Sequence, residues 1–233
     1  MLHIRIIWKF VEGMVKIMIK ISDIETYGWE TAIRGMRNPM NSWDNSDSAW
    51  FIEWGNPKFN IGKNDLSLMK KLASAGNDHG KFMRMITVTM DIEAPLYWWK
   101  EFDTYKVGTV ANSCSTMHKI QEKEFTLDDF SHEHLTHTDA FHMDANEDAL
   151  NALQVVINAL NYNRKKYLET KDKTYWWQMI QLLPSSYNQK RTVQLNYAVL
   201  KNIYHARKHH KLDEWHRLCE IIETLPHSEL ITG

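Results

Sequence analysis

The sequence predicts an α+β fold, with strands in the first half of the chain and helices in the second. Val15 to Ile21 alternates with period two, as a half-buried strand does, and Phe82 to Ile92 is rich in Thr and Val. From Asn146 onward, apolar residues recur every three or four positions, which indicates amphipathic helices. Strands followed by helices in this order are typical of α+β domains.

Length and composition indicate a globular chain. The 233 residues are 43% hydrophobic and 24% charged, a balance that favours a folded core over disorder. A chain of this length buries a substantial core, so we expect a single domain over residues 1–233. In this interpretation residues 1–17 are an N-terminal extension, and Met14 or Met18 is an alternative start.

The charge balance argues against bulk electrostatic binding to a nucleic acid polymer or an anionic membrane. Lys plus Arg number 28 and Asp plus Glu number 29, which gives a net charge of -1. Charged residues interrupt the apolar N-terminal segment, so we expect neither a signal peptide nor a membrane span there. Cys114 and Cys219 have no metal-binding or redox spacing, which indicates a reduced, cytoplasmic protein without a disulfide.

Helix and loop signals divide the first half of the chain. We expect a helix over Thr26 to Arg37 and then a long loop from Asn38 to Gly62. Asn64 is the expected N-cap of a helix that runs through Ala75. The loop is unusually aromatic, and we expect its large side chains to pin it to the core, with a ligand lid as the alternative. These side chains are Trp43, Trp50, Phe51, Trp54 and Phe59.

Helices dominate the expected second half. Ala94-Pro95 opens a helix from Leu96 to Tyr105, because proline suits the first helical turn. Four further helices follow from the spacing of apolar residues and from Pro184. Their approximate ranges are Asn146 to Thr170, Tyr175 to Leu183, Gln189 to His209 and Leu212 to Thr224.

A histidine-rich stretch runs from His132 to His137, with His142 beyond it. Neutral imidazoles ligate zinc. The residue four positions after His132 is Thr136, however, so the HExxH spacing is absent. We therefore expect a solvated polar loop and no metal site.

Asn112 to Thr116 is a run of small polar residues around Cys114. Such a run either turns backbone amides and hydroxyls toward an anion or forms a plain turn. The Cys114 thiol is a useful nucleophile only if a cation or a helix N-terminus lowers its pKa. Otherwise it is an ordinary, partly buried cysteine.

One face of the expected helix from Gln189 is half polar. Asn196, Leu200, Ile203 and Arg207 fall on this face at spacings of four, three and four. A buried arginine needs an anionic or carbonyl partner. Arg207 is therefore either a ligand contact or one half of an internal salt bridge.

Two segments of the chain resemble the flavin-dependent thymidylate synthases. Ala94-Pro95-Leu96-Tyr97 matches the start of the family's helix, and the RHRxxSxNExSxRY signature then falls without a gap on Thr104 to Met117. The later segment places Leu183-Pro184, Asn196, Asn202 and Arg207 at the family's spacing. The resemblance covers residues 76–215 loosely. It implies a central antiparallel or mixed sheet flanked by helices, and a homotetramer that shares its sites between subunits.

The resemblance also implies ligands and site residues. FAD is the implied cofactor, NADPH and methylene-tetrahydrofolate are the cosubstrates, and a pyrimidine nucleotide such as dUMP is the substrate. Arg207 resembles the arginine that holds the pyrimidine ring, and Cys114 and Arg207 are the candidate catalytic residues. The implied flavin contacts are Thr104, Tyr105, Lys106, Asn196 and Asn202, and the nucleotide contacts are Glu101, Ser113, Cys114, Ser115, Thr116 and Arg207.

The signature itself is heavily altered in this chain. The family's Arg, His and Arg are Thr104, Tyr105 and Lys106, its Asn-Glu pair is Ala111-Asn112, its phosphate-binding arginine is Thr116, and an upstream flavin-contacting histidine is Met85. Loss of two guanidiniums removes bidentate phosphate contacts, and loss of Glu and His changes the electrostatics of hydride transfer. The expected replacement cations are Lys100, Lys106, Arg84 and Lys190.

These features support two main functions. The first is an enzyme that methylates dUMP, or carries out a variant such as hydroxymethylation with Cys114 as nucleophile. The alternative is a catalytically inactive nucleotide-binding protein, a sensor or sponge, that keeps Arg207 on the same scaffold. A third is an assembly protein whose aromatic residues form an oligomer interface.

Overall fold

The computed structural model describes residues 19–136 and 148–233. The predicted N-terminal extension, most of the strand expected from Val15, and His137 and His142 lie outside these residues. None of the described helices has the length and apolar character that crossing a bilayer requires.

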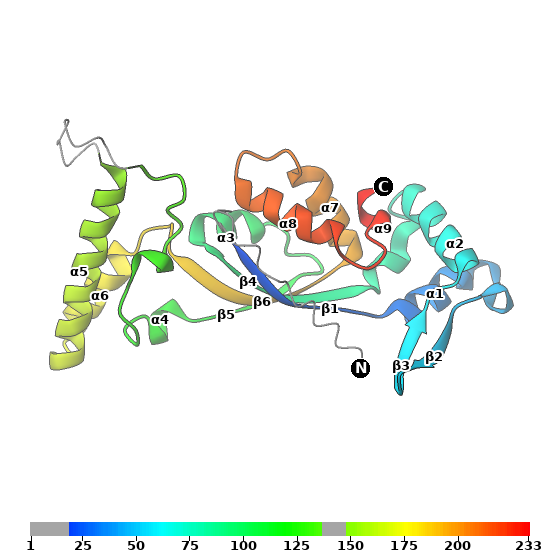
Figure 1. The fold of residues 1–233 in the computed structure, drawn as a ribbon, viewed down its shortest axis with the longest axis horizontal. Helices are drawn as coiled ribbons and strands as arrows, with labels where there is room; N and C mark the ends of the chain where they lie inside the picture. The colour runs from blue at the N-terminus through cyan, green and yellow to red at the C-terminus, as the bar shows by residue number, and fades with distance from the viewer. Residues whose placement is uncertain (1–18, 137–147) are drawn as a thin grey trace.

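A four-stranded antiparallel sheet forms the centre of the molecule (Figure 1). Its strand order is β1 (Lys20–Tyr27), β4 (Thr87–Pro95), β6 (Asn188–Asn196) and β5 (Val110–Ser113). Alternate residues of β4 are buried, which matches the side-chain period of a strand covered on one face. The α+β class that the sequence predicts is thus confirmed.

Helices cover one face of this sheet, as Figure 1 shows. They are α3 (Leu96–Phe102), α7 (Tyr197–Arg207), α8 (Asp213–Glu223) and α9 (Glu229–Thr232). The opposite face carries polar pairs, among them the ion pair of Lys190 with Asp91. One sheet face therefore builds the core and the other presents charged side chains.

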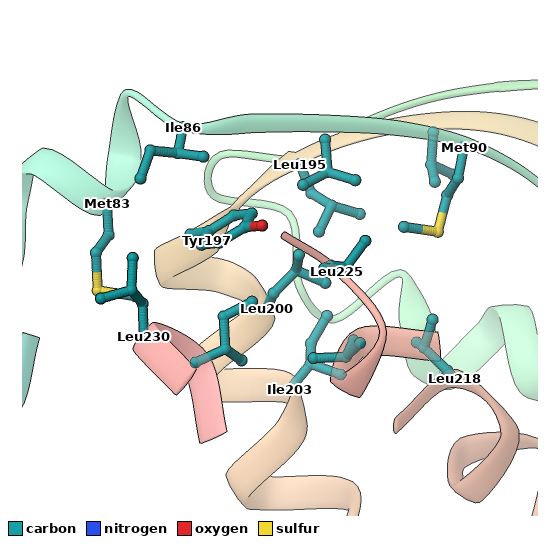
Figure 2. Close-up of a cluster of buried hydrophobic side chains, with 14 of the residues drawn as sticks. Met83, Ile86, Met90, Leu195, Tyr197, Leu200, Ile203, Leu218, Leu225 and Leu230 are labelled. Carbon is teal, nitrogen blue, oxygen red and sulfur yellow. The ribbon is translucent and has the colours of Figure 1, made fainter. Parts of the chain in front are cut away.

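The main hydrophobic core lies between the sheet and these helices. Figure 2 shows Tyr197 among apolar side chains from the sheet and from the chain around α7, α8 and α9. The side chains labelled there that are almost fully buried include Ile86, Met90, Leu195, Leu200, Ile203, Leu218 and Leu230. The Tyr197 hydroxyl donates a hydrogen bond to the Pro226 carbonyl, so this polar group is satisfied inside the core.

The predicted helix from Gln189 to His209 is wrong in part. Gln189 to Asn196 forms strand β6, and helix α7 begins only at Tyr197. Asn196 is the N-cap of α7, where its side chain accepts a hydrogen bond from the Val199 backbone amide at 3.1 Å. This segment forms a strand rather than a helix because β6 pairs with both β4 and β5, which satisfies its backbone hydrogen-bonding groups on both sides. The C-terminal half is therefore not all helical.

Strand β4 also begins later than predicted. The segment from Gly80 to Arg84 is a short 3-10 helix, and β4 starts at Thr87. In the same region the helix expected from Leu96 to Tyr105 ends at Phe102, and the short helix α4 (Thr116–Lys119) follows β5.

Helices α1 (Trp29–Arg37) and α2 (Lys63–Ser74) lie at one end of the sheet with a hairpin of β2 (Ala49–Glu53) and β3 (Asn56–Asn60). The sequence predicts a loop in place of this hairpin. Trp54 and Gly55 both have positive φ angles at its tip, as a tight two-residue hairpin turn requires. Most of the aromatic residues are not pinned to the core: Trp54 is 94% exposed, and only Phe59 packs against the main core.

The expected N-cap of α2 is also wrong. Gly62 holds the cap position without a side-chain hydrogen bond. Instead, the Asp47 carboxylate accepts hydrogen bonds from the backbone amides of Asn64 at 2.9 Å and Asp65 at 3.0 Å. A carboxylate from a distant loop thus does the work of a local cap.

Two antiparallel helices form an arm at the other end of the sheet (Figure 1). Helices α5 (Ala149–Thr170) and α6 (Lys173–Leu182) pack together around a second hydrophobic cluster that includes Leu160, Met179 and Phe130. Tyr187, one residue before β6, packs against this cluster. Val193 and Leu195 of β6 belong to the main core, so one segment reaches both clusters.

Candidate functional site

Arg207 ends α7 and reaches toward the end of α3. Its Nη1 donates a hydrogen bond to Glu101 Oε2 at 2.9 Å, and its Nε donates one to the Tyr105 hydroxyl at 2.8 Å. The Arg207 side chain is 18% exposed and the Glu101 side chain 35% exposed. The internal salt bridge, one of the two interpretations of Arg207, is therefore present in the structure.

Aromatic rings fix the position of this ion pair. The Arg207 guanidinium lies 4.7 Å from the centre of the Trp215 ring, a distance typical of a cation–π contact. The Trp215 indole N–H also donates to Glu101 Oε2 at 3.1 Å, and His210 Nε2 lies 3.4 Å from the same oxygen. Glu101 is thus the centre of a cluster in which a cation and two ring N–H groups face one carboxylate.

The rigidity of the cluster follows from the core beneath it. Trp98 and Trp215 are fully buried with ring centres 4.8 Å apart, and Phe102 stacks on Trp98. Because α3 and α8 contribute these rings, the helix that carries Glu101 and the helix that carries Trp215 cannot move independently.

A second guanidinium lies on β6. Arg191 Nη1 donates to Asp103 Oδ1 at 2.8 Å, and its Nε donates to Gln189 Oε1 at 3.0 Å. The guanidinium lies 4.2 Å from the centre of the Trp99 ring. Gln189 in turn donates from Nε2 to the Cys114 carbonyl at 2.9 Å. Arg191 is thereby tied to the altered signature segment.

The small polar segment is an edge strand that leads into a short helix. Ser113 ends β5, and Cys114 continues the pairing by donating its backbone amide to the Lys190 carbonyl at 2.9 Å. The Ser115 hydroxyl accepts the His118 backbone amide at 3.1 Å, so it caps α4. Thr116 is the first residue of that helix. Cys114 is exposed, in contrast to the partly buried cysteine expected from base rates.

The predicted flavin contacts are mostly engaged within the chain. The Thr104 hydroxyl donates to the Glu101 carbonyl at 2.7 Å, and the Tyr105 hydroxyl accepts from Arg207. Lys106 and Asn202 are exposed.

Gly108 brings the signature loop against α7. A Cβ at this position would lie 2.8 Å from Asn196 Nδ2 and 3.3 Å from Val199 Cγ2, and the Gly108 φ angle is +79°. Only glycine fits both the space and the left-handed backbone. The predicted common face of Asn196 and Arg207 does not exist, however, because Asn196 precedes the helix and its Oδ1 caps it.

The expected replacement cations have different surroundings. Lys190 forms an ion pair with Asp91 at 2.7 Å on the outer face of the sheet, and the hydrogen bond that its ammonium donates to Asp91 raises the pKa of Lys190. Lys100, Lys106 and Arg84 are exposed. Met85 is 45% exposed, and its sulfur lies close to Gly35 of α1.

The described part of the histidine-rich stretch is a loop. His132 Nδ1 lies 2.7 Å from the Phe130 carbonyl, and His134 Nε2 lies 3.3 Å from Asp213 Oδ2. Within residues 19–136 and 148–233, no group of three or more His, Cys, Asp or Glu side chains is arranged to hold a metal ion.

Sequence reasoning missed Arg191, Gln189 and Asp103. The prediction of a helix from Gln189 overlooked the strand-like alternation of β6, in which Gln189, Val193 and Leu195 are buried. That alternation was the available signal. No sequence pattern would have paired Arg191 with Asp103, because the two are 88 residues apart.

Comparisons with known proteins identify the fold. No protein-family model and no curated protein matches this sequence. Solved structures do match. The flavin-dependent thymidylate synthase ThyX from Helicobacter pylori, complexed with FAD and dUMP, is 17% identical with a TM-score of 0.63, over 90% of this chain and 97% of that chain. A second structure of that enzyme with FAD and dUMP, at 16% identity, has a TM-score of 0.64 and covers 92% and 96%.

A related methylase shares the arrangement. The UMP/dUMP methylase PolB from Streptomyces cacaoi, bound with 5-Br UMP, is 12% identical with a TM-score of 0.57, over 88% of this chain and 87% of that chain. Similarity at this level of identity establishes architecture. The chain has the fold of the flavin-dependent thymidylate synthases.

Proposed function

We propose that this protein acts on a pyrimidine deoxynucleotide, with dUMP as the first candidate, and that Arg207 contacts the pyrimidine ring. The observation that carries the proposal is the cluster of Arg207, Glu101 and Trp215. It presents a guanidinium whose other N–H groups have no hydrogen-bond partner in residues 19–136 and 148–233, together with a carboxylate and an indole ring at a partly open surface. The carbonyl oxygens of a uracil edge accept hydrogen bonds, so they are complementary to the guanidinium.

The solved relatives support the same ligand class. The Helicobacter pylori enzyme was solved with FAD and dUMP, and the Streptomyces cacaoi methylase with 5-Br UMP or 5-Br dUMP. We infer methylation of dUMP, or a variant such as hydroxymethylation, as the reaction class. NADPH and methylene-tetrahydrofolate are the proposed cosubstrates.

The residues around Gly108 fit a flavin in part. Asn196 Nδ2 faces Gly108, where a Cβ would fill the space, and the side chains of Lys106 and Asn202 are exposed. Amide and ammonium donors suit the carbonyl oxygens and phosphates of FAD. We propose that Lys106, Asn196 and Asn202 hold the cofactor. When bound, FAD supplies hydride transfer.

Cys114 is the proposed nucleophile toward the ring. Its thiol is exposed at the end of β5, and its carbonyl is held by Gln189. In a variant chemistry the thiolate adds to one ring carbon, the neighbouring carbon takes up the new substituent, and loss of the proton from that neighbouring carbon expels the thiolate. Cys114→Ser should therefore lower the turnover of dUMP and leave dUMP binding intact.

A single pair of measurements tests the proposal. The absorbance spectrum of the freshly purified protein reports bound flavin by a band at about 450 nm. Calorimetry with dUMP reports nucleotide binding. Arg207→Ala should abolish binding, whereas Arg217→Ala, which removes an exposed arginine paired with Glu220 on α8, should leave it unchanged. Unchanged dUMP affinity in Arg207→Ala would refute the placement of the ring.

The second candidate function is a nucleotide-binding protein without catalysis, a sensor or sponge. The observation that favours it is the selective loss of family residues. Arg207 is kept, while Thr104, Asn112 and Thr116 stand where the family has Arg, Glu and Arg. Tight dUMP binding by a colourless protein that takes up no FAD would establish this candidate and exclude the first.

We also propose a homotetramer in the cytoplasm, as the resemblance implies. Light scattering of the protein during size-exclusion chromatography measures the mass directly. A mass close to the 27.6 kDa of one chain would contradict the tetramer.

A further inference from the structure

We propose that Arg191 binds the phosphate of the nucleotide, in place of the phosphate-binding arginine at whose position this sequence has Thr116. The inference rests on the proposed function, since it names the phosphate contact of the same nucleotide. It does not follow from the family signature, because Arg191 lies on β6, outside the signature segment.

The strand register places Arg191 beside the predicted nucleotide contacts. Arg191 pairs directly with Ser113 across β5 and β6. Directly opposed residues of an antiparallel pair point to the same face, with Cβ atoms about 4.5–5.5 Å apart. The Ser113 hydroxyl and the Arg191 guanidinium therefore lie on one face of the sheet, the face that also carries α3.

Alternation removes the other strand cation from this face. Lys190 precedes Arg191 and so points the opposite way, where it pairs with Asp91. Of the cations on β6, Arg191 alone lies on the side of α3, Glu101 and Arg207. Arg207 contacts Glu101 and Arg191 contacts Asp103, so the two guanidiniums reach residues two positions apart at the end of α3.

Arg191 retains donors for a ligand. A guanidinium has five N–H groups. Two are used, by Gln189 and Asp103, and the remaining three have no hydrogen-bond partner among the described residues. A fork of free N–H groups on a guanidinium matches the oxygens of a phosphate in a bidentate arrangement.

The guanidinium is also held in place before a ligand arrives. Trp99 stacks on it at 4.2 Å, and Gln189, itself buried, fixes Nε. The Arg191 side chain is 15% exposed, so its ordering costs little further entropy on binding. Asp103 is 47% exposed and bonds Arg191 through one oxygen, so it can rotate away when a phosphate binds.

A comparison of two ligands isolates the phosphate contact. Calorimetry of the full-length protein with dUMP and with deoxyuridine separates phosphate affinity from ring affinity. We expect Arg191→Gln to weaken dUMP binding by roughly ten- to a hundredfold, the value of a charge-assisted hydrogen bond, and to leave deoxyuridine binding unchanged. Arg191→Lys should recover part of the loss, because it restores the charge without the fork.

Asp103→Asn serves as the matched control. It keeps the size of the side chain and removes the competing negative charge, so dUMP should bind as tightly as in the wild type or more tightly. A merely structural role for Arg191 predicts the opposite pattern. Arg191→Gln would then weaken the binding of dUMP and of deoxyuridine equally, and Asp103→Asn would weaken both in the same way. That pattern would overturn the inference.

A titration with inorganic phosphate separates this inference from the proposed function. The unfolding temperature of the wild type should rise more with phosphate than with chloride at equal ionic strength. This extra rise should vanish in Arg191→Gln. Arg191→Lys should retain part of it. If the wild type binds no dUMP but shows this Arg191-dependent shift, the proposed function fails and the phosphate contact stands. If the wild type shows no extra rise in unfolding temperature with phosphate, or if Arg191→Gln shows the same rise as the wild type, the proposed phosphate contact is wrong.

Discussion

At the residue scale, Glu101 decides how available Arg207 is to a ligand. Its Oε2 receives hydrogen bonds from Arg207 and Trp215 and lies near His210. In the proposed complex, a pyrimidine carbonyl shares the guanidinium with this carboxylate, and a dianionic phosphate nearby is repelled by it. The carboxylate therefore limits affinity while it positions the arginine.

We predict that Glu101→Gln tightens dUMP binding by about three- to tenfold, because it removes the competing negative charge and keeps an oxygen for the Trp215 N–H. Isothermal titration calorimetry measures the change. Glu101→Ala is the contrasting variant: it leaves the indole N–H and Arg207 without an acceptor, so it should weaken binding. Equal effects of the two substitutions would contradict this account.

The two cysteines should differ in reactivity. Burial raises the pKa of the Cys219 thiol to about 11, whereas Cys114 is exposed. At pH 8 only about one thousandth of Cys219 is then thiolate, the form that reacts. Iodoacetamide should modify Cys114 alone in the folded protein and both cysteines in denaturant, as peptide mass spectrometry will show. Modification of Cys219 at the same rate as Cys114 would contradict its burial.

At the element scale, a buried ion pair joins α1 to α2. Arg37 and Asp65 are 5% and 0% exposed, and Arg37 Nε donates to Asp65 Oδ1 at 2.7 Å. Burial raises the pKa of Asp65, but hydrogen bonds from Ser46, Ser48 and Arg37 outweigh it, so the pKa lies below its usual value. The hydroxyls and Arg37 together favour the charged form.

This depressed pKa has a defined pH dependence. The ionised carboxylate contributes stability above the pKa of the unfolded chain, about 3.9, and the contribution is lost as the pH falls through the lower folded value. We predict that Asp65→Asn lowers the free energy of unfolding by about 3–5 kcal/mol at pH 7, because Arg37 is left buried and unpaired. The deficit relative to the wild type should shrink below about pH 4, which denaturant titrations at both pH values will measure.

Sequence patterns predicted most elements, and the failures have physical causes. Helices α1, α2, α5, α6 and α8 lie close to their expected ranges, because periodic apolar residues and helix-ending Pro or Gly mark them. The hairpin was missed because its turn carries Trp54 rather than the Asn or Asp usual before Gly55. Strand β6 was missed because its pairing partners are distant in sequence, so only its alternation marked it.

The candidate site was predictable to a similar degree. The resemblance selected Glu101, Tyr105 and Arg207, and the structure brings these three into contact. It could not select Arg191, since the contact with Asp103 depends on the register of β6 against β5 and on the end of α3. Tertiary contacts of this kind have no local sequence signal.

At the scale of the whole molecule, two hydrophobic clusters stabilise different parts of the chain. The main core holds the sheet and α7, α8 and α9, and the second cluster holds the α5–α6 arm. The candidate site residues Glu101 and Arg207 rest on the main core through Trp215. Local unfolding of the arm should therefore not expose the site.

We predict that Leu160→Ala destabilises the arm by about 2–5 kcal/mol, because Leu160 is fully buried in the second cluster. Hydrogen exchange measured by mass spectrometry should accelerate in α5 and α6 and stay slow in β4. Binding of dUMP should persist. Equal acceleration across the sheet would show that the clusters unfold as one unit.

The continuity of β6 gives the arm a mechanical connection to the centre of the sheet. The strand spans nine residues, roughly 30 Å, and is anchored in the second cluster just before Asn188 and in the main core at its other end. Because β6 is hydrogen-bonded to a neighbouring strand on each edge and anchored at both ends, we expect it to bend little. We therefore expect a displacement of α5 and α6 to reach Arg191 through the backbone of β6.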